Sequence, residues 1–213
     1  MSAPPDLDKL LGRTRDLTEQ YLAGGVEAFP AFRELTHLLL RLTVMVEPDG
    51  GLRLVFGPRG KDRAVLEGWI ESALVPLNDG RLLRFSVVLY LEEYEGRTRL
   101  KVEKSLYQYQ VDERGDRWVV RYDYLRYPAE PHPGMHVQIR GALTEDGVLA
   151  SQETLERIHF PTGRVALEAV IRMLVEQFHV PVNTPPEVWR PILAESEKSF
   201  HQIAHRSVSG PTT

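Results

Sequence analysis

Apolar and polar residues alternate most clearly between Arg117 and Gly141, in the run RWVVRYDYLRYPAEPHPGMHVQIRG. A period of two is typical of a β-strand, because successive side chains of a strand point to opposite faces. The run predicts two strands joined by a proline-rich corner, since proline has no N–H to donate and restricts the residue before it. If the two strands pair, four polar residues share one face: Arg121, Asp123, His136 and Gln138.

The rest of the pattern predicts both helices and strands. Apolar residues at spacings of three and four predict helices over 6–23, 31–38, 62–75, 164–178 and 187–205. Alternation and turn residues predict a hairpin near 39–57, strands over 83–93 and 97–111, and a short strand that reaches Pro161. We therefore expect an α+β protein, in which an antiparallel β-sheet meander is packed by the 164–178 helix and flanking helices lie at both ends.

Three consecutive parts are predicted along the chain. Residues 1–79 form N-terminal helices and a hairpin, and residues 80–180 form the core of antiparallel sheet and packing helix. Residues 181–213 form a linker, a terminal helix and a disordered tail.

Charge and cysteine content narrow the function classes. The net charge of −4 argues against whole-surface attraction to nucleic acid, although residues 97–126 hold more Lys and Arg than Asp and Glu. The chain has no cysteine, which excludes disulfides, thiolate zinc sites and a cysteine nucleophile. No apolar run reaches the ~20 residues that span a membrane, and the first residues lack the features of a signal peptide, so we expect a cytoplasmic protein without membrane contact.

The motifs of several enzyme classes are absent from the sequence. It has no GxxxxGK[ST] loop, no GxGxxG after a strand, no HExxH and no GxSxG. Nucleotide hydrolysis, dehydrogenase chemistry and serine-hydrolase chemistry are therefore disfavoured.

Three histidines carry the clearest candidate chemistry: His132, His136 and His159. They fit ordinary structural histidines, a zinc site, or a metal-free role in acid–base chemistry or phosphate contact. His132 and His136 straddle a Pro-Gly corner, so the helical His-x3-His geometry of zinc sites is not supplied. We therefore expect no metal and no cofactor, and we predict that His132 or His136 acts as a proton shuttle, since free imidazole titrates near pH ~6.5.

Basic and aromatic residues on the same strands suggest nucleic-acid binding. Arg121 and Arg126 suit phosphate, which arginine holds with two parallel hydrogen bonds, although Arg121 beside Asp123 also fits a structural ion pair. Aromatic rings interleaved with cations can hold single-stranded nucleic acid by stacking and charge. Alternatively, the aromatic side chains of these strands belong to the hydrophobic core. The candidate binding residues are Lys101, Lys104, Tyr107, Tyr109, Tyr122, Tyr124 and Arg126.

Three features together resemble the TumE-type family of small toxins from bacterial toxin–antitoxin pairs. They are the strand KSLYQYQVDERGDRWVVRYDY, the Arg121-Tyr122-Asp123 triplet and the Pro-His element that begins at His132. The resemblance covers about residues 80–178, and that family shows a similar strand, an Arg-aromatic-Asp run and a Pro-His-rich stretch.

The resemblance implies a toxin–antitoxin or defence component that acts on RNA by metal-independent His/Arg chemistry. RNA and a small antitoxin-like protein are its candidate partners, and Arg121, Asp123, His132 and His136 are its candidate catalytic residues. The alternative is a non-enzymatic protein–protein interaction module of a bacterial complex. In that case the flanking helices bind a protein partner or a second copy of the chain, and the histidine corner is structural.

Overall fold

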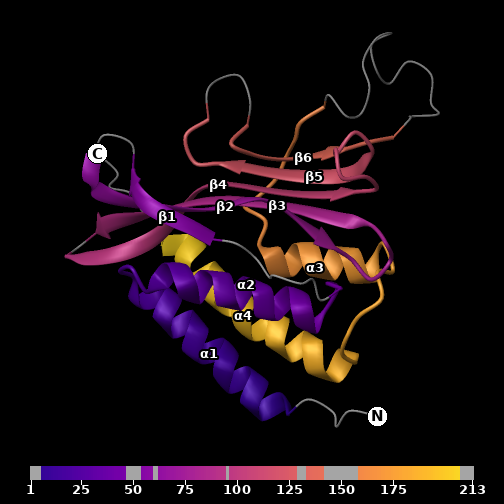
Figure 1. Cartoon of the computed structure of the whole chain (residues 1–213), viewed down its shortest axis with the longest axis horizontal. Helices are drawn as coiled ribbons and strands as arrows, with labels where there is room; N and C mark the ends of the chain where they lie inside the picture. Colours follow the sequence, from indigo (N-terminus) through magenta and orange to yellow (C-terminus); the bar gives the residue numbers. More distant parts are fainter. Residues whose placement is uncertain are drawn as a thin grey trace. The chain divides into compact units, whose positions relative to one another are not determined.

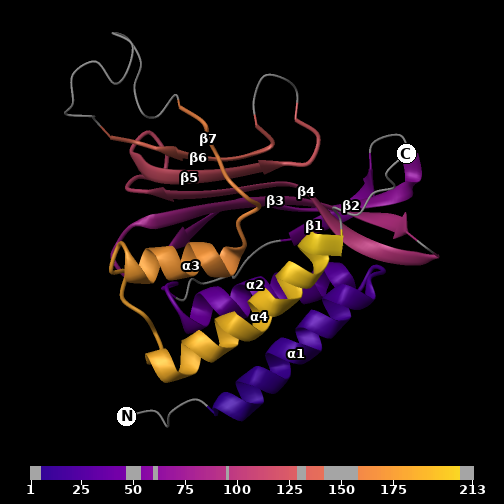
Figure 2. The same ribbon diagram turned by 180° about the vertical axis from the view of Figure 1, so that it is seen from behind.

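The computed structural model describes residues 6–46, 54–59, 62–94, 96–128, 133–141 and 158–206. It confirms the α+β class, with an antiparallel meander and helices at both ends of the chain (Figures 1 and 2). The helices are α1 (Leu7–Ala23), α2 (Ala28–Leu42), α3 (Leu167–Glu176) and α4 (Pro186–Arg206). The strands are β1 (Leu54–Arg59), β2 (Asp62–Pro76), β3 (Leu82–Tyr94), β4 (Arg97–Gln110), β5 (Trp118–Leu125), β6 (Met135–Ile139) and β7 (Phe160–Pro161).

The strands follow one another across the sheet in sequence order, β1 to β7. Short turns join several neighbouring strands, and the turn between β4 and β5 shows how the sequence encodes one. The carboxylate of Asp112 accepts hydrogen bonds from the backbone N–H groups of Gly115, Asp116 and Arg117, at 2.7, 3.0 and 2.9 Å. Asp side chains commonly close turns in this way, so residues 112–116 form a tight turn between the two strands.

Two compact units interleave along the sequence, whereas three consecutive parts were predicted. The helical unit consists of Met1–Glu47, Leu91–Leu100 and Ala166–Thr213, and the sheet unit consists of Pro48–Tyr90 and Lys101–Val165. The candidate site residues of the sequence that the structure describes all lie in the sheet unit.

Within the helical unit, α1, α2 and α4 pack against one another, as both ribbon views show (Figures 1 and 2). Leu17 of α1 and Leu193 of α4 are buried, and Arg15 donates to Glu195 between the same two helices at 3.0 Å. The terminal helices therefore bury apolar residues inside this unit. No helix in the described part of the chain is both long and apolar enough to cross a membrane.

The predicted helix over 31–38 is confirmed as part of α2. The first strand of the hairpin predicted near 39–57 is wrong, because α2 continues to Leu42, whereas its second strand overlaps β1. Pro30 lies in the first turn of this helix, where proline is tolerated because the N–H it lacks would have no helical partner. The last carbonyls of α2 are satisfied by the segment before α4. Asn183 Nδ2 donates to the carbonyl of Arg41 at 2.9 Å, and Thr184 Oγ1 donates to that of Leu42 at 2.7 Å. Residues 47–53 lie outside the described residues.

The predicted helix over 62–75 is also wrong, since these residues form strand β2. The strand pairs with β1 on one side and β3 on the other, and its register shifts between Ile70 and Ala73. A bulge of this kind changes which side chains point to each face, so it breaks the alternation by which a strand is recognised. Apolar residues on either side of the bulge then fall at helix-like spacings.

The other predicted elements are confirmed, with small shifts at their ends. These are the helices over 6–23, 164–178 and 187–205, the strands over 83–93 and 97–111, the two strands around the proline corner, and the short strand that reaches Pro161.

Candidate functional site

Strands β5 and β6 pair in the register that places the predicted polar cluster on one face. Arg121 lies opposite Gln138, and Asp123 lies opposite His136. Side chains of residues that face each other across a strand pair point to the same side of the sheet. The prediction that these four residues share a face is therefore confirmed, and we call this side of β5 and β6 the His/Arg face.

Arg121 and Asp123 form a two-point ion pair on the His/Arg face. The Nε and Nη2 groups of Arg121 donate to the two carboxylate oxygens of Asp123 at 2.6 and 3.0 Å. The side chain of Arg121 is 37% exposed and that of Asp123 is 14% exposed. The guanidinium is thus oriented by the carboxylate while part of it faces solvent.

His136 has protein neighbours at both ring nitrogens. Its Nδ1 lies 3.0 Å from the carbonyl oxygen of Pro133, and its Nε2 lies 3.7 Å from Oδ2 of Asp123. A carbonyl oxygen only accepts hydrogen bonds, so Nδ1 is the donor in this contact. Nε2 then faces the carboxylate, and this contact becomes an ion pair when the ring carries a second proton. The other predicted proton shuttle, His132, lies outside the described residues.

A second histidine, His159, reaches this cluster from the position immediately before β7. The rings of His136 and His159 lie with their centroids 4.4 Å apart and their planes tilted by 59°. The sequence left a structural role, a zinc site and a metal-free role open for His159. In the described part of the chain no three His, Cys, Asp or Glu side chains are grouped to hold a metal ion. A long stretch separates the two histidines in the sequence, so only the pairing of β6 with β7 brings them together.

The neighbouring part of the same face, on β3 and β4, is covered by the turn after β4. Gln108 lies opposite Arg121 and donates to the side chain of Gln110 at 2.8 Å. Arg84 donates to that same amide at 3.1 Å and to the carbonyl of Glu113, in the turn, at 2.8 Å. Both glutamines are buried, which leaves the β5–β7 part of the His/Arg face for contact with a ligand.

The structure does not support Tyr107 and Tyr109 as stacking residues, because their side chains are 8% and 1% exposed. Tyr109 donates to Oδ2 of Asp79 at 2.6 Å and accepts from Nη1 of Arg81 at 2.5 Å. Burial, with the hydrogen bond to Asp79, raises the pKa of Tyr109 to about 12. These two tyrosines are therefore core residues and do not form a stacking surface.

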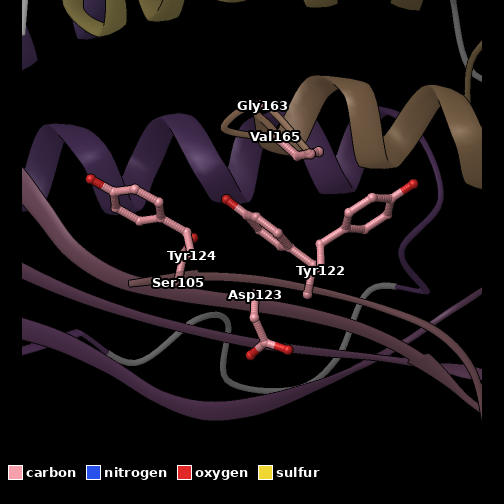
Figure 3. A pocket seen from close by; sticks show the side chains of 7 residues that line it. Ser105, Tyr122, Asp123, Tyr124, Gly163 and Val165 are labelled. Carbon is pink, nitrogen blue, oxygen red and sulfur yellow. The ribbon is translucent and has the colours of Figure 1, made fainter. Parts of the chain in front are cut away.

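Tyr122 and Tyr124 point to the opposite side of β5 from Asp123, as Figure 3 shows. They line a small hollow whose empty space is about 180 Å³, part of it open to solvent, together with Ser105, Gly163 and Val165. The centre of a water molecule could occupy only about 10 Å³ of it, far below the roughly 300 Å³ at which ligand pockets usually begin. Burial also raises the pKa of Tyr122. The predicted tyrosines and the His/Arg face thus belong to two different surfaces of the sheet.

The predicted lysines and Arg126 differ in their surroundings. Lys101 is 8% exposed, so it is not available to a phosphate chain. The guanidinium of Arg126 lies 6.0 Å from the ring centre of Tyr90 and 5.9 Å from that of Tyr127, within the range of cation–π contacts. Lys104 is exposed on β4, and its pairing with Leu125 places it on the same side of the sheet as Arg121.

Comparisons of this chain with protein-family models, with curated proteins and with solved structures find no match. The resemblance to the TumE-type family therefore stays a prediction that rests on sequence features. Function has to be argued from the site itself, because a fold does not determine an activity.

Proposed function

We propose that this chain binds single-stranded RNA and cleaves it at the His/Arg face, without a metal ion, as a component of a toxin–antitoxin or defence system. The observation that carries the proposal is the cross-strand pairing of Asp123 with His136, beside the ion-paired Arg121 and the adjoining ring of His159. Such a cluster combines a guanidinium, which binds anions, with imidazoles, which transfer protons.

RNA is the substrate class that best suits this set of side chains. Arginine recognises phosphate in a planar, two-point fashion, and histidine transfers protons near neutral pH. The remaining requirement is a nucleophile, and RNA supplies its own in the 2′-hydroxyl. Attack of the 2′-oxygen forms a bond to phosphorus as the bond to the 5′-oxygen breaks, which gives a 2′,3′-cyclic phosphate and a 5′-hydroxyl.

The charges on this side of the sheet support binding of a polyanion. Arg121 and the exposed Lys104 contribute two positive charges, and Asp123 contributes one negative charge close to Arg121. A locally positive surface on a chain of net charge −4 would bind RNA weakly and with strong dependence on salt.

Purified protein incubated with labelled single-stranded RNA in the presence of EDTA tests the proposal, alongside growth of a bacterial host that expresses the chain. We expect wild type to cleave the RNA and slow growth, and we expect His136→Ala to lower the cleavage rate by about tenfold or more. The matched control is His179→Asn, since His179 is exposed in the helical unit and has a φ of 55° that asparagine tolerates. Intact RNA with wild type, together with equal growth of all strains, contradicts the proposal.

A protein-interaction module is the second candidate, favoured by apolar side chains on the other side of the sheet. Met135, Ile139 and Phe160 are 38, 44 and 37% exposed, and their pairing places them on the side of Tyr122 and Tyr124. The terminal helices, by contrast, bury apolar residues inside the helical unit. Co-purification of one stoichiometric protein from the native host, lost in Ile139→Asp, supports this candidate; recovery of the chain alone counts against it.

A further inference from the structure

We propose that His159 is the catalytic residue that moves the proton, and that His136 is the positioning residue that holds its ring. In this arrangement the phosphate of the RNA lies above Gln138, between Arg121 and His159. The inference rests on the proposed cleavage of RNA, and it assigns to His159 a role that sequence reasoning gave to His132 or His136.

The contacts of His136 favour a positioning role. Its Nδ1 donates to the carbonyl of Pro133, and its Nε2 faces the carboxylate of Asp123, which Arg121 also holds. The hydrogen bond at Nδ1 ties the ring to the Pro133 carbonyl, and the carboxylate of Asp123 occupies the space beside Nε2, so the ring has little freedom to turn toward a substrate. Its side chain is 12% exposed, which also limits its contact with RNA.

The strand register places His159 in the same row of the sheet as Gln138 and Arg121. Val137 pairs with Phe160, so continuing the same antiparallel register puts His159 beside Gln138. Gln138 in turn lies opposite Arg121. Arg121, Gln138 and His159 thus form one row across three strands, with about 10 Å between the outer two backbones, given the 4.7–4.9 Å spacing of neighbouring strands.

That row matches the needs of a bound phosphodiester. The guanidinium of Arg121 and the amide of Gln138 supply donors for phosphate oxygens, and the contact between the rings of His136 and His159 shows that His159 lies on the same side of the sheet. A phosphate between Arg121 and His159 would have its adjoining 2′-hydroxyl next to the imidazole. No other part of the described site brings a guanidinium, an amide and an imidazole into one row.

The reaction balances without a metal or a further cofactor. His159 takes the proton of the 2′-hydroxyl as the 2′-oxygen bonds to phosphorus. The bond from phosphorus to the 5′-oxygen breaks, the leaving oxygen takes a proton from water, and His159 later returns its proton to solvent. Two charged side chains of β5 lie beside the histidine pair, namely Arg121 and Asp123.

The test compares His159→Gln with His136→Gln on an RNA oligonucleotide and on the same oligonucleotide with one 2′-deoxy position, in EDTA. We expect wild type to give 2′,3′-cyclic phosphate ends and to leave the 2′-deoxy position uncut. His159→Gln should lower kcat by at least 100-fold with KM unchanged within threefold, and should remove the pH dependence of kcat. His136→Gln should lower kcat by about tenfold and keep a pH dependence, because the proton-transfer group remains.

Two further measurements distinguish the loss of a catalytic group from the loss of folding. The affinity of His159→Gln for a fully 2′-deoxy oligonucleotide, which cannot be cleaved by this route, should equal that of wild type. Added imidazole should restore part of the activity of His159→Gly and none of that of Arg121→Ala.

The outcomes separate this inference from the proposed function. Cleavage by His159→Gln within twofold of wild type, or failure of imidazole to rescue His159→Gly, overturns the role of His159 alone. Loss of the pH dependence in His136→Gln instead makes His136 the proton-transfer group. A wild-type protein that cuts no RNA overturns the proposed function, and this inference with it.

Discussion

Replacing Asp123 with asparagine should weaken the fold and strengthen RNA binding at the same time. The substitution keeps the shape of the side chain but removes the negative charge that holds Arg121 in a two-point ion pair. Hydrogen bonds to charged groups contribute about 1.5–3 kcal/mol when well buried, and exposed ion pairs contribute about 0.2–1 kcal/mol. Because the side chain of Arg121 is 37% exposed and that of Asp123 14%, we expect a loss of about 1 kcal/mol in the free energy of unfolding.

The same change leaves the positive charge of Arg121 without its counter-charge. One unit of charge about 6 Å from a phosphate, in largely aqueous surroundings, is worth about 1 kcal/mol. We therefore expect about fivefold tighter binding of a single-stranded oligonucleotide at low salt, and a smaller gain at high salt. Cleavage should nevertheless slow, since Arg121 loses the two-point contact that orients its guanidinium.

Chemical denaturation and fluorescence anisotropy measure the two effects on one preparation. Glu113→Gln is the control, because it removes one negative charge from an exposed position in the turn after β4 while the backbone carbonyl that accepts from Arg84 remains. The control should bind like wild type. Unchanged stability, or an affinity for the oligonucleotide that stays the same or falls in Asp123→Asn, would refute the reasoning.

Two further predictions test the helical unit. Gly24→Ala should destabilise the protein by more than about 2 kcal/mol, because a Cβ there would lie 1.7 Å from the carbonyl oxygen of Thr98 and φ is 79°. Gly12→Ala should stabilise the protein by about 0.5–1 kcal/mol, because Gly12 lies inside α1 with open space around it. Equal melting temperatures of the two variants would contradict this contrast. Burial raises the pKa of Glu168 despite the hydrogen bond from Ser196, so the folded state holds this proton more tightly than the unfolded state does. Glu168 therefore costs stability as the pH rises above 4.5, the ordinary pKa of a glutamate. Glu168→Gln should raise the melting temperature at pH 7 and change it little at pH 4.5, and a difference that does not depend on pH would count against this prediction.

The faces of β5 and β6 could be predicted from the sequence because two local signals agree there. Regular alternation assigns Arg121 and Asp123 to one side of their strand, and the short proline corner leaves few ways for the next strand to pair. The observed pairing of Asp123 with His136 is the direct result. Where a bulge interrupts alternation, as between Ile70 and Ala73, the same reasoning predicted a helix in place of a strand.

The composition of the site could be predicted only in part. His159 joins it through the pairing of β6 with β7, which no local pattern reveals. The tyrosines were assigned to nucleic-acid binding because aromatic residues near cations fit a binding sheet as well as they fit a core. Burial decides between a binding surface and a core. Tyr109 is 1% exposed, and Asp79 and Arg81 hold its hydroxyl by hydrogen bonds within the sheet unit.

The most direct test of the His/Arg face is equilibrium binding of a labelled 2′-deoxy oligonucleotide to wild type, Arg121→Ala and Arg114→Ala at low salt. Both variants remove one positive charge, but Arg114 is exposed in the turn after β4 and is not a member of the row that Arg121 forms with Gln138. We predict at least tenfold weaker binding for Arg121→Ala and a change of less than twofold for Arg114→Ala. Equal affinities for all three proteins would contradict the assignment of this face as the place where RNA is held.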